Sequence, residues 1–467
     1  MQIIKHMARV LLISSNVTEE PMPVYPLGLS VIASALAAQG HLVEQFDFLA
    51  AGRSLDRLRA RIAAFAPGYV GIGIRNLDNC DSLTRISYPA LAGQLVEVVR
   101  ETPGIPVILG GSAFSLMPAE LMALTGADHG VVGEGEGAVC DLIRELEAGR
   151  RPPSLVRGSG PLEAGAMAAP LFSTELVGFY RERSGMINFQ TKRGCSEHCV
   201  YCNYPQLEGN RLRPMDPRAV VDALERAKRE HRADSFFFTD AFFNDREGHY
   251  LAVVEELLRR DLGLSWCCYM RPQGLGRREV ALMVRAGLHA VELGTDAATD
   301  TTLRAMGKGL SFDDVLASTA ACAAEGLPCA HFVMFGGPGE TRETVAEGLA
   351  NLARLDRSVV FAFSGIRILP GTALQTLAVR EGLIAPDASL LEPAYYFAPG
   401  LDVEAMNQAI AQAFRQRRDW IFPPEEGRRR HEALYRMGYK GLLWDTLLRR
   451  RPAPPATSAH RNDHANT

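Results

Sequence analysis

Residues 191–205 read TKRGCSEHCVYCNYP, and this segment carries Cys195, Cys199 and Cys202 at spacings of four and three residues. It follows a short apolar run at 187–190, which is typical of a strand. A loop that folds back after a strand can present three thiolates to one iron–sulfur cube. Three cysteine ligands leave the fourth iron of a [4Fe–4S] cluster with an open coordination position. The segment therefore predicts a cluster-binding loop whose ligands are these three cysteines.

Zinc is the alternative ligand for the same segment, since His198 completes a Cys3His set. Structural zinc sites usually draw their ligands from two separated segments, and here there is only one. His198 is also the immediate neighbour of Cys199. The iron–sulfur cluster is therefore the favoured interpretation.

Downstream of the cysteine loop, short apolar runs alternate with amphipathic segments. The expected strands are Ile187–Gln190, Ser235–Thr239, Ser265–Tyr269, Ala290–Leu293, Ala330–Met334 and Val359–Ile368, and the expected helices are Pro217–His231, Gly248–Arg260, Arg278–Ala286, Phe312–Glu325 and Arg342–Leu355. About six β/α units in succession predict a partial parallel barrel, since a closed barrel has eight. Its open side can admit a bulky substrate or a second cofactor.

Upstream of the cysteine loop, the same alternation begins near residue 8. The expected strands are Val10–Ser14, Leu42–Phe48, Tyr69–Ile74, Pro106–Leu109 and His129–Val132, and the expected helices are Leu27–Gln39, Ser54–Phe65, Tyr88–Glu101, Pro118–Leu124 and Gly137–Ala148. Strict alternation predicts a doubly wound, Rossmann-like parallel sheet covered on both faces. The fold class of the chain is therefore α/β.

Composition shifts suggest where the domains end. We expect an N-terminal domain over 1–150, a linker rich in Pro, Gly and Ala over 151–184, the barrel over 185–395, a small helical region over 396–450 and a disordered tail over 451–467. Within the helical region, the pattern predicts helices at Val403–Arg415 and Gly427–Arg449. Tyr395, Tyr396, Trp420 and Tyr435 are candidates to line a substrate pocket there, although aromatic residues on helices are more often core.

Composition also excludes some functions. The chain has 467 residues and a formal net charge of -4, so it lacks the overall basic field that attracts nucleic acid. No apolar run approaches the roughly 18 residues of a membrane span, and the N-terminus has no signal-peptide pattern. Nine cysteines, an odd number, indicate reduced thiols and a cytoplasmic protein.

Six cysteines lie outside the loop. Cys80, Cys140, Cys322 and Cys329 stand singly among apolar neighbours and are expected to be buried packing residues. Cys267 and Cys268 are adjacent in a predicted strand, so their side chains should point to opposite faces of the sheet.

The motifs resemble a known family. The spacing CxxxCxxC, with Tyr201 before the last cysteine, resembles the radical S-adenosylmethionine (SAM) superfamily, and TKRGC…YCNYP followed by EGNRLRPMDP resembles its cobalamin-dependent branch. In the N-terminal half, PLGLSVIASALAAQGH, GIGIRNLDN, VILGGSAF and GVVGEGEGA resemble B12-binding modules and occur in the family's order. The resemblance covers nearly the whole chain and implies three cofactors: a [4Fe–4S] cluster, SAM and cobalamin.

The resemblance also implies which residues contact SAM. They are Tyr201 in the cysteine loop, Thr239 and Asp240 after the second barrel strand, Gly294, Thr295 and Asp296 at the end of the fourth, and Gly337, Pro338 and Gly339 in the fifth unit. All follow the carboxyl ends of strands, where the active sites of barrels form.

In the N-terminal domain, the candidate cobalamin contacts lie in loops at the carboxyl ends of the strands. They are Arg75, Asn76, Gly110, Gly111, Ser112, Gly133, Glu134, Gly135 and Glu136. The motif Asp-x-His-x-x-Gly, whose histidine coordinates cobalt, is absent, because Asp128-His129-Gly130 has the wrong spacing. We therefore expect no histidine ligand to cobalt from this domain, and Arg75 is a candidate for the lower face.

The function that the resemblance implies is a cobalamin-dependent radical SAM methyltransferase. It would transfer a methyl group from SAM, via methylcobalamin, to an unactivated centre of a secondary metabolite or lipid. Its partners would be this small-molecule substrate and a flavodoxin- or ferredoxin-type electron donor. A non-methylating radical rearrangement or oxidative cyclisation is the main alternative, and a cobalamin-binding sensor with a vestigial cluster is a third.

Overall fold

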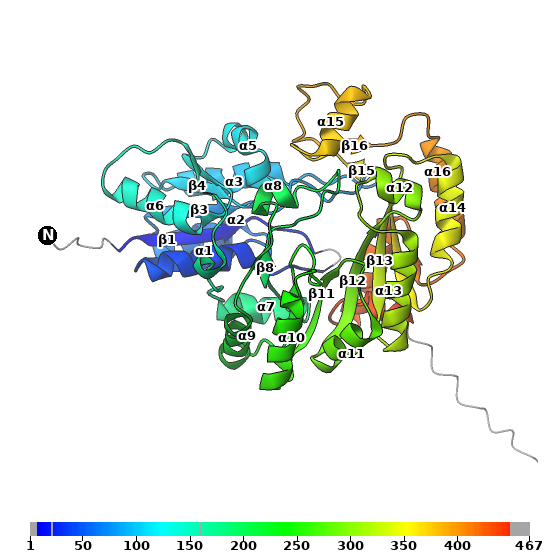
Figure 1. Ribbon diagram of the computed structural model, residues 1–467. Helices are drawn as coiled ribbons and strands as arrows, with labels where there is room; N and C mark the ends of the chain where they lie inside the picture. Colours follow the sequence, from blue (N-terminus) through cyan, green and yellow to red (C-terminus); the bar gives the residue numbers. More distant parts are fainter. Residues whose placement is uncertain (1–6, 20–21, 159, 449–467) are drawn as a thin grey trace, which may run out of the picture.

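The computed structural model describes residues 7–19, 22–158 and 160–448. Two parallel sheets dominate it, and the loops between them form the middle of the molecule (Figure 1). No helix in the described ranges is long and apolar enough to cross a membrane. The tail predicted over 451–467 lies outside the described residues.

The first sheet has the order β2-β1-β3-β4-β5-β6, and all its strands are parallel. Its strands are β1 (Arg9–Ser14), β2 (Leu42–Asp47), β3 (Tyr69–Gly73), β4 (Val107–Gly110), β5 (His129–Val132) and β6 (Leu155–Arg157), and its helices are α1 (Leu27–Ala38), α2 (Leu55–Phe65), α3 (Pro89–Arg100), α4 (Ser112–Leu116), α5 (Pro118–Thr125) and α6 (Gly135–Glu147). Buried apolar clusters cover both faces. The predicted doubly wound domain is confirmed.

The segment 151–184, predicted as a linker, contains regular structure that the sequence pattern did not indicate. β6 pairs with β5 and completes the first sheet. A short 3-10 turn (Ala164–Ala166) and helix α7 (Thr174–Arg183) follow, and α7 packs against α9 (Pro217–His231) of the second domain.

The second sheet has the order β17-β14-β13-β12-β11-β10-β7, again all parallel, which confirms the partial barrel. Its strands are β7 (Ile187–Phe189), β10 (Ser235–Phe238), β11 (Ser265–Met270), β12 (Leu288–Asp296), β13 (Cys329–Phe335), β14 (Ser358–Ser364) and β17 (Trp420–Ile421), and α9 is followed by α10 (His249–Arg260), α11 (Arg277–Arg285), α12 (Asp300–Ala305), α13 (Phe312–Ala324) and α14 (Arg342–Leu352). The edge strand β17 was not predicted.

The two faces of this sheet differ. One face packs on the helices, and Cys268 belongs to that cluster. Cys267 points to the opposite, concave inner face, where it packs with Phe237, Phe361 and Trp444. The two cysteines thus lie on opposite faces, as predicted. Trp444 lies in a 3-10 turn (Trp444–Leu448) near the C-terminus that packs against β14. The C-terminal segment therefore closes one end of the barrel from inside.

The C-terminal region contains α15 (Ala373–Arg380), a small hairpin of β15 (Ile366–Arg367) and β16 (Tyr395–Tyr396), α16 (Val403–Phe414) and α17 (Pro424–Arg436). The helix predicted over Gly427–Arg449 was wrong at its end, because Gly438 and Gly441 take left-handed φ angles of 84° and 98°. Tyr396 and Trp420 are buried core residues.

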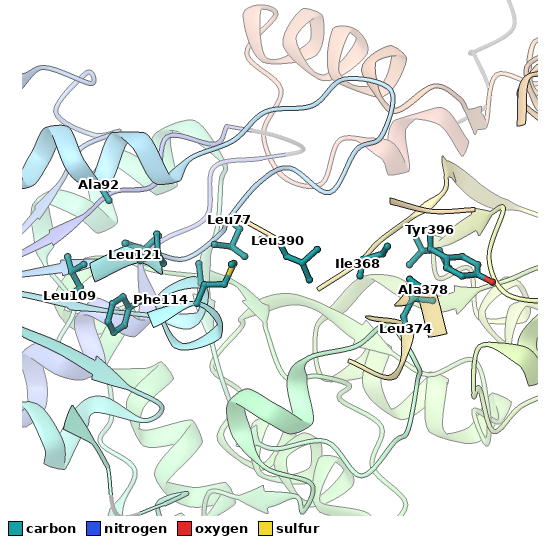
Figure 2. Close-up of a cluster of buried hydrophobic side chains, with 14 of the residues drawn as sticks. Leu77, Ala92, Leu109, Phe114, Leu121, Ile368, Leu374, Ala378, Leu390 and Tyr396 are labelled. Atoms are coloured by element: carbon teal, nitrogen blue, oxygen red, sulfur yellow. The ribbon is translucent and has the colours of Figure 1, made fainter. Parts of the chain in front are cut away.

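A continuous apolar core joins the two domains. Figure 2 shows Leu77 of the first domain close to Leu390 and Ile368 of the second. A buried ion pair reinforces this junction: Arg367 Nε donates to Asp78 Oδ2 at 2.7 Å, and both side chains are almost fully buried. Cys80, two residues after Asp78, has a left-handed backbone (φ 53°) and is exposed, not buried as predicted.

Candidate functional site

The cysteine loop lies between the short strand β8 (Lys192–Arg193) and α8 (Tyr204–Glu208). Cys195 N donates to Gly209 O at 3.1 Å, and Val200 N donates to Met306 O at 3.0 Å. Gly194 has a φ of 88°, and a Cβ there would come within 2.0 Å of Arg211 O. The loop is thus tied down on two sides, and only glycine fits at its start.

A buried charge network holds the base of the loop. Asp240 is fully buried and accepts from the backbone N and the hydroxyl of Thr191 at 2.6 and 2.5 Å. Lys192 Nζ donates to Asp245 at 2.8 Å and lies 3.7 Å from Asp240. Asp240 was predicted to contact SAM, but its carboxylate has no exposed surface. It positions the strand that enters the cysteine loop.

The three loop cysteines are free thiols with raised pKa values. Burial raises the pKa of Cys202 to about 12, and burial also raises the pKa of Cys195 and of Cys199. Buried thiols of this kind lose their protons to a bound metal, which supplies the missing positive charge.

The donor set of the loop suits an iron–sulfur cluster. Within the described ranges, no group of three His, Cys, Asp or Glu side chains is arranged to hold a single metal ion, and His198 is exposed. An iron–sulfur cube binds each cysteine to a different iron, so three cysteines can hold it and leave the fourth iron open.

Two cations that the sequence analysis missed lie beside the cysteines. Lys308 pairs with Asp296, which also accepts from the Tyr201 hydroxyl at 2.6 Å. Arg271 pairs with Glu197 at 2.8 Å. Each cation is paired with one carboxylate, so these two ion pairs add no net charge beside the cluster loop.

The other predicted SAM residues divide into two groups. Gly294 and Asp296 lie partly exposed at the carboxyl end of β12, and Thr239 lies partly exposed after β10. Thr295 was wrongly placed in the site, since its fully buried hydroxyl meets His331 Nδ1 at 2.8 Å on the other face of the sheet.

Residues 337–339 also differ from the prediction. Gly337 and Pro338 are buried. A Cβ on Gly337 would approach Ile366 Cδ1 to 2.8 Å, and one on Gly339 would approach Ala305 Cβ to 3.1 Å. These glycines allow segments of protein to pack closely, and the structure gives no open surface for SAM at Gly337 and Pro338.

In the first domain, the predicted loops after β3 and β4 form an accessible edge. Arg75, Gly111 and Ser112 are exposed there, with Asn76 and Gly110 half-buried. Ser112 Oγ donates to Arg75 O at 2.7 Å, and Gly111 (φ 101°) must be glycine because a Cβ would lie 2.5 Å from Ile74 O. His129 begins β5, at the opposite edge of the sheet. The structure therefore leaves His129 far from this edge.

The loop Gly133–Glu136 joins the domains. Only Gly133 is exposed. Gly135 packs against Ile32, where a Cβ would approach to 2.9 Å. Glu134 pairs with Arg213 and lies 3.5 Å from Arg193, whose Nη2 lies 2.6 Å from Glu136. Both carboxylates thus form ion pairs with arginines of the second domain.

The carboxyl ends of the two sheets face each other across this middle region. Helix α4, at the edge of the first sheet, contacts α8, which follows the cysteine loop. Burial raises the pKa of Tyr204 and of Tyr269, and the charge of Arg75 acts in the opposite direction on both. Arg75, which is exposed just after the carboxyl end of β3, lies on the first domain's side of this region.

Two family models match the chain. One, described as the radical SAM superfamily, matches residues 189–350, and the other, described as a B12 binding domain, matches residues 13–143. Among curated relatives, tryptophan 2-C-methyltransferase of Streptomyces laurentii is 27% identical over 430 residues, covering 74% of this chain and 71% of that protein.

Another relative differs in its reaction. Anaerobic magnesium-protoporphyrin IX monomethyl ester cyclase of Rubrivivax gelatinosus is 26% identical over 349 residues, covering 69% of this chain and 60% of that protein. Among solved structures, the radical SAM methyltransferase TsrM from Kitasatospora setae, with cobalamin and a [4Fe–4S] cluster bound, superposes with a TM-score of 0.82 at 22% identity, covering 95% of this chain and 97% of that one. The whole two-domain arrangement is therefore shared.

Proposed function

Because the chain belongs to the radical SAM enzymes that also carry a B12-binding domain, we propose that it transfers a methyl group from SAM to a small-molecule acceptor, a secondary metabolite or a lipid. Its cofactors are those of the cobalamin-dependent family: a [4Fe–4S] cluster, SAM and cobalamin. The observation that carries the proposal is the contact between α4, at the carboxyl edge of the first sheet, and α8, which follows the cysteine loop.

Different residues of the chain would hold different cofactors. Cys195, Cys199 and Cys202 would hold the cluster, and Tyr201 with Asp296 would border the SAM site. The exposed edge at Arg75 and Gly110–Ser112 would hold cobalamin. When bound, the cluster supplies an electron for cleavage of SAM, and cobalamin carries the methyl group. The protein orients these groups against the substrate and excludes water.

Cobalt would have no histidine ligand from this domain, because His129 lies at the far edge of the sheet. Arg75 would be the candidate for its lower face, since it is exposed just after the carboxyl end of β3. An external electron donor of the flavodoxin or ferredoxin type would reduce the cluster.

Metal analysis tests the proposal first. Protein purified without oxygen and reconstituted with iron, sulfide and hydroxocobalamin should hold about four irons and one cobalt per chain. The Cys202→Ala variant should lose the cluster absorbance and keep cobalt. Wild-type protein without retained cobalt would contradict the methyl-transfer proposal.

Product mass then separates methyl transfer from the alternative. With SAM that carries a deuterated methyl group, a product of methyl transfer gains that label. The relationship to the Rubrivivax gelatinosus cyclase favours a radical cyclisation as the second candidate, which leaves the label out of the product.

A further inference from the structure

The turn that follows α12 lies directly on the cysteine loop. Met306 O accepts from Val200 N at 3.0 Å. Gly307 has a φ of 70°, and a Cβ there would come within 2.6 Å of His198 O. Lys308 is the next residue of this turn. The close packing therefore fixes the backbone of Lys308 against the loop that carries the three cysteines.

The side chain of Lys308 reaches the end of β12. Its Nζ donates to Gly294 O at 3.0 Å and to Asp296 Oδ2. The same Oδ2 accepts from the Tyr201 hydroxyl at 2.6 Å. Tyr201 stands between the second and third cysteines of the loop. Lys308, Asp296 and Tyr201 thus form a continuous chain of polar contacts from the turn to the cysteine loop.

The charges of this ion pair are sheltered from water and act on the loop. The side chains of Lys308 and Asp296 are 9% and 16% exposed, so solvent ions screen them little. Burial raises the pKa of the Cys199 thiol; the positive charge of Lys308 opposes this rise, and the negative charge of Asp296 adds to it. The two charges therefore cancel each other near the Cys199 sulfur. The proposed function assigns no role to Lys308.

Resting on the proposed binding of a cluster, we propose that the Lys308–Asp296 pair sets the reduction potential of the cluster, and that Lys308 is the positioning residue that compensates the Asp296 charge. Reduction moves one electron, and no proton, from the flavodoxin- or ferredoxin-type donor to the cluster, which gains one negative charge. An uncompensated Asp296 opposes this gain, and an uncompensated Lys308 favours it. The pair thus keeps the cluster reducible while its carboxylate holds Tyr201.

A redox titration of the reconstituted holoenzyme without SAM tests this inference without turnover. Titanium(III) citrate supplies the electron, and the low-temperature electron paramagnetic resonance signal of the reduced cluster gives the ratio of reduced to oxidised cluster. At the wild-type midpoint potential, this ratio should fall about tenfold in Lys308→Met, a downward shift of about 59 mV for a one-electron couple. In Asp296→Asn the ratio should rise about tenfold, because the Lys308 charge then stands alone.

The opposite directions separate charge from structure. Loss of packing would move both variants the same way, whereas an asparagine oxygen at position 296 still accepts from Tyr201. The double variant Lys308→Met with Asp296→Asn carries no net charge and should return close to the wild-type potential, as should Lys308→Arg, which keeps the charge. Arg277→Met removes one partner of an exposed ion pair with Glu325 and should leave the potential unchanged.

The outcomes distinguish this inference from the proposed function. Unchanged potentials in Lys308→Met and Asp296→Asn, or shifts of both in one direction, would overturn the inference. Iron and cobalt contents and incorporation of the labelled methyl group are measured separately, so the proposed function would still stand. If Lys308→Met retains no iron, the absence of an upward shift in Asp296→Asn overturns the inference by itself. Wild-type protein without a cluster would contradict the proposed function and this inference with it.

Discussion

Replacing Asp78 with Asn tests the buried ion pair between the two domains. Arg367 donates to Asp78 through Nε at 2.7 Å, and its two other nitrogens donate to Ile368 O and Leu390 O at 2.5 and 2.7 Å. Asp78 also accepts from Cys80 N at 2.8 Å, which an asparagine oxygen can still do. The substitution therefore removes the negative charge and leaves the Arg367 charge buried.

The expected cost is about 3–5 kcal/mol, the usual penalty for breaking a buried pair. At about 1.4 kcal/mol per factor of ten, the local opening equilibrium should rise by roughly two to four orders of magnitude. Hydrogen exchange of peptides spanning 366–368 and 394–396 measures this opening, since Ile368 N donates to Ala394 O beside the β15–β16 hairpin. Peptides from β1 serve as an internal reference.

Two controls make the result decisive. Ser82→Ala removes another contact between the domains, the 2.5 Å hydrogen bond to Ser364 O, and should cost only about 0.5–1.5 kcal/mol. The double variant Asp78→Leu with Arg367→Met should recover most of the loss, because no charge is then left buried. An Asp78→Asn effect no larger than that of Ser82→Ala would refute the reasoning.

Three further predictions concern other parts of the chain. Gly194→Ala should abolish iron incorporation while cobalamin binding persists, because its Cβ would meet Arg211 O at 2.0 Å; iron and cobalt analysis checks this. Glu134→Gln should lower the melting temperature by several degrees through the buried Arg213 and Arg193 contacts, whereas Glu145→Gln, in an exposed pair with Arg150, should change it little. Lys192→Met leaves Asp240 and Asp245 buried without a cation, so the stability of the variant in urea should fall well below that of wild type at pH 7. The charge of Lys192 no longer holds down the pKa of the two carboxyls, so both become protonated more readily as the pH falls. The difference in stability from wild type should therefore shrink toward pH 4.

Much of the fold follows from local pattern. Alternating apolar runs and amphipathic segments predicted both parallel sheets, because strand and helix periods differ clearly and parallel strands require crossover helices. The spacing of Cys195, Cys199 and Cys202 likewise indicated a loop, which the structure places between β8 and α8. Short elements such as β6 and β17 escaped prediction, since runs of two or three residues carry no measurable period.

The site residues were harder to predict because they depend on which way each side chain points. Asp240 follows β10 and Thr295 lies at the end of β12, as expected. Asp240 is nevertheless enclosed by Thr191 and Lys192, and Thr295 faces His331. A register shift between Leu293 and Asp296 separates neighbours that the sequence treats as one group. Lys308 gave no signal, since a lone charged residue near a turn is common.

The position of the proposed cobalamin edge relative to the cysteine loop depends on ion pairs that belong to neither of them. On one side, Glu134 and Glu136 of the first domain bind Arg193 and Arg213, which flank the cysteine loop in β8 and β9 (Arg213–Pro214). On the other side, Asp78 binds Arg367. Arg75 follows the carboxyl end of β3, three residues before Asp78 of the second junction. Because both junctions are buried ion pairs, removing one charge at either should misalign the cobalamin edge against the cluster without touching a cofactor ligand. Such variants would retain both cofactors and still lose the methyl transfer that requires them in line.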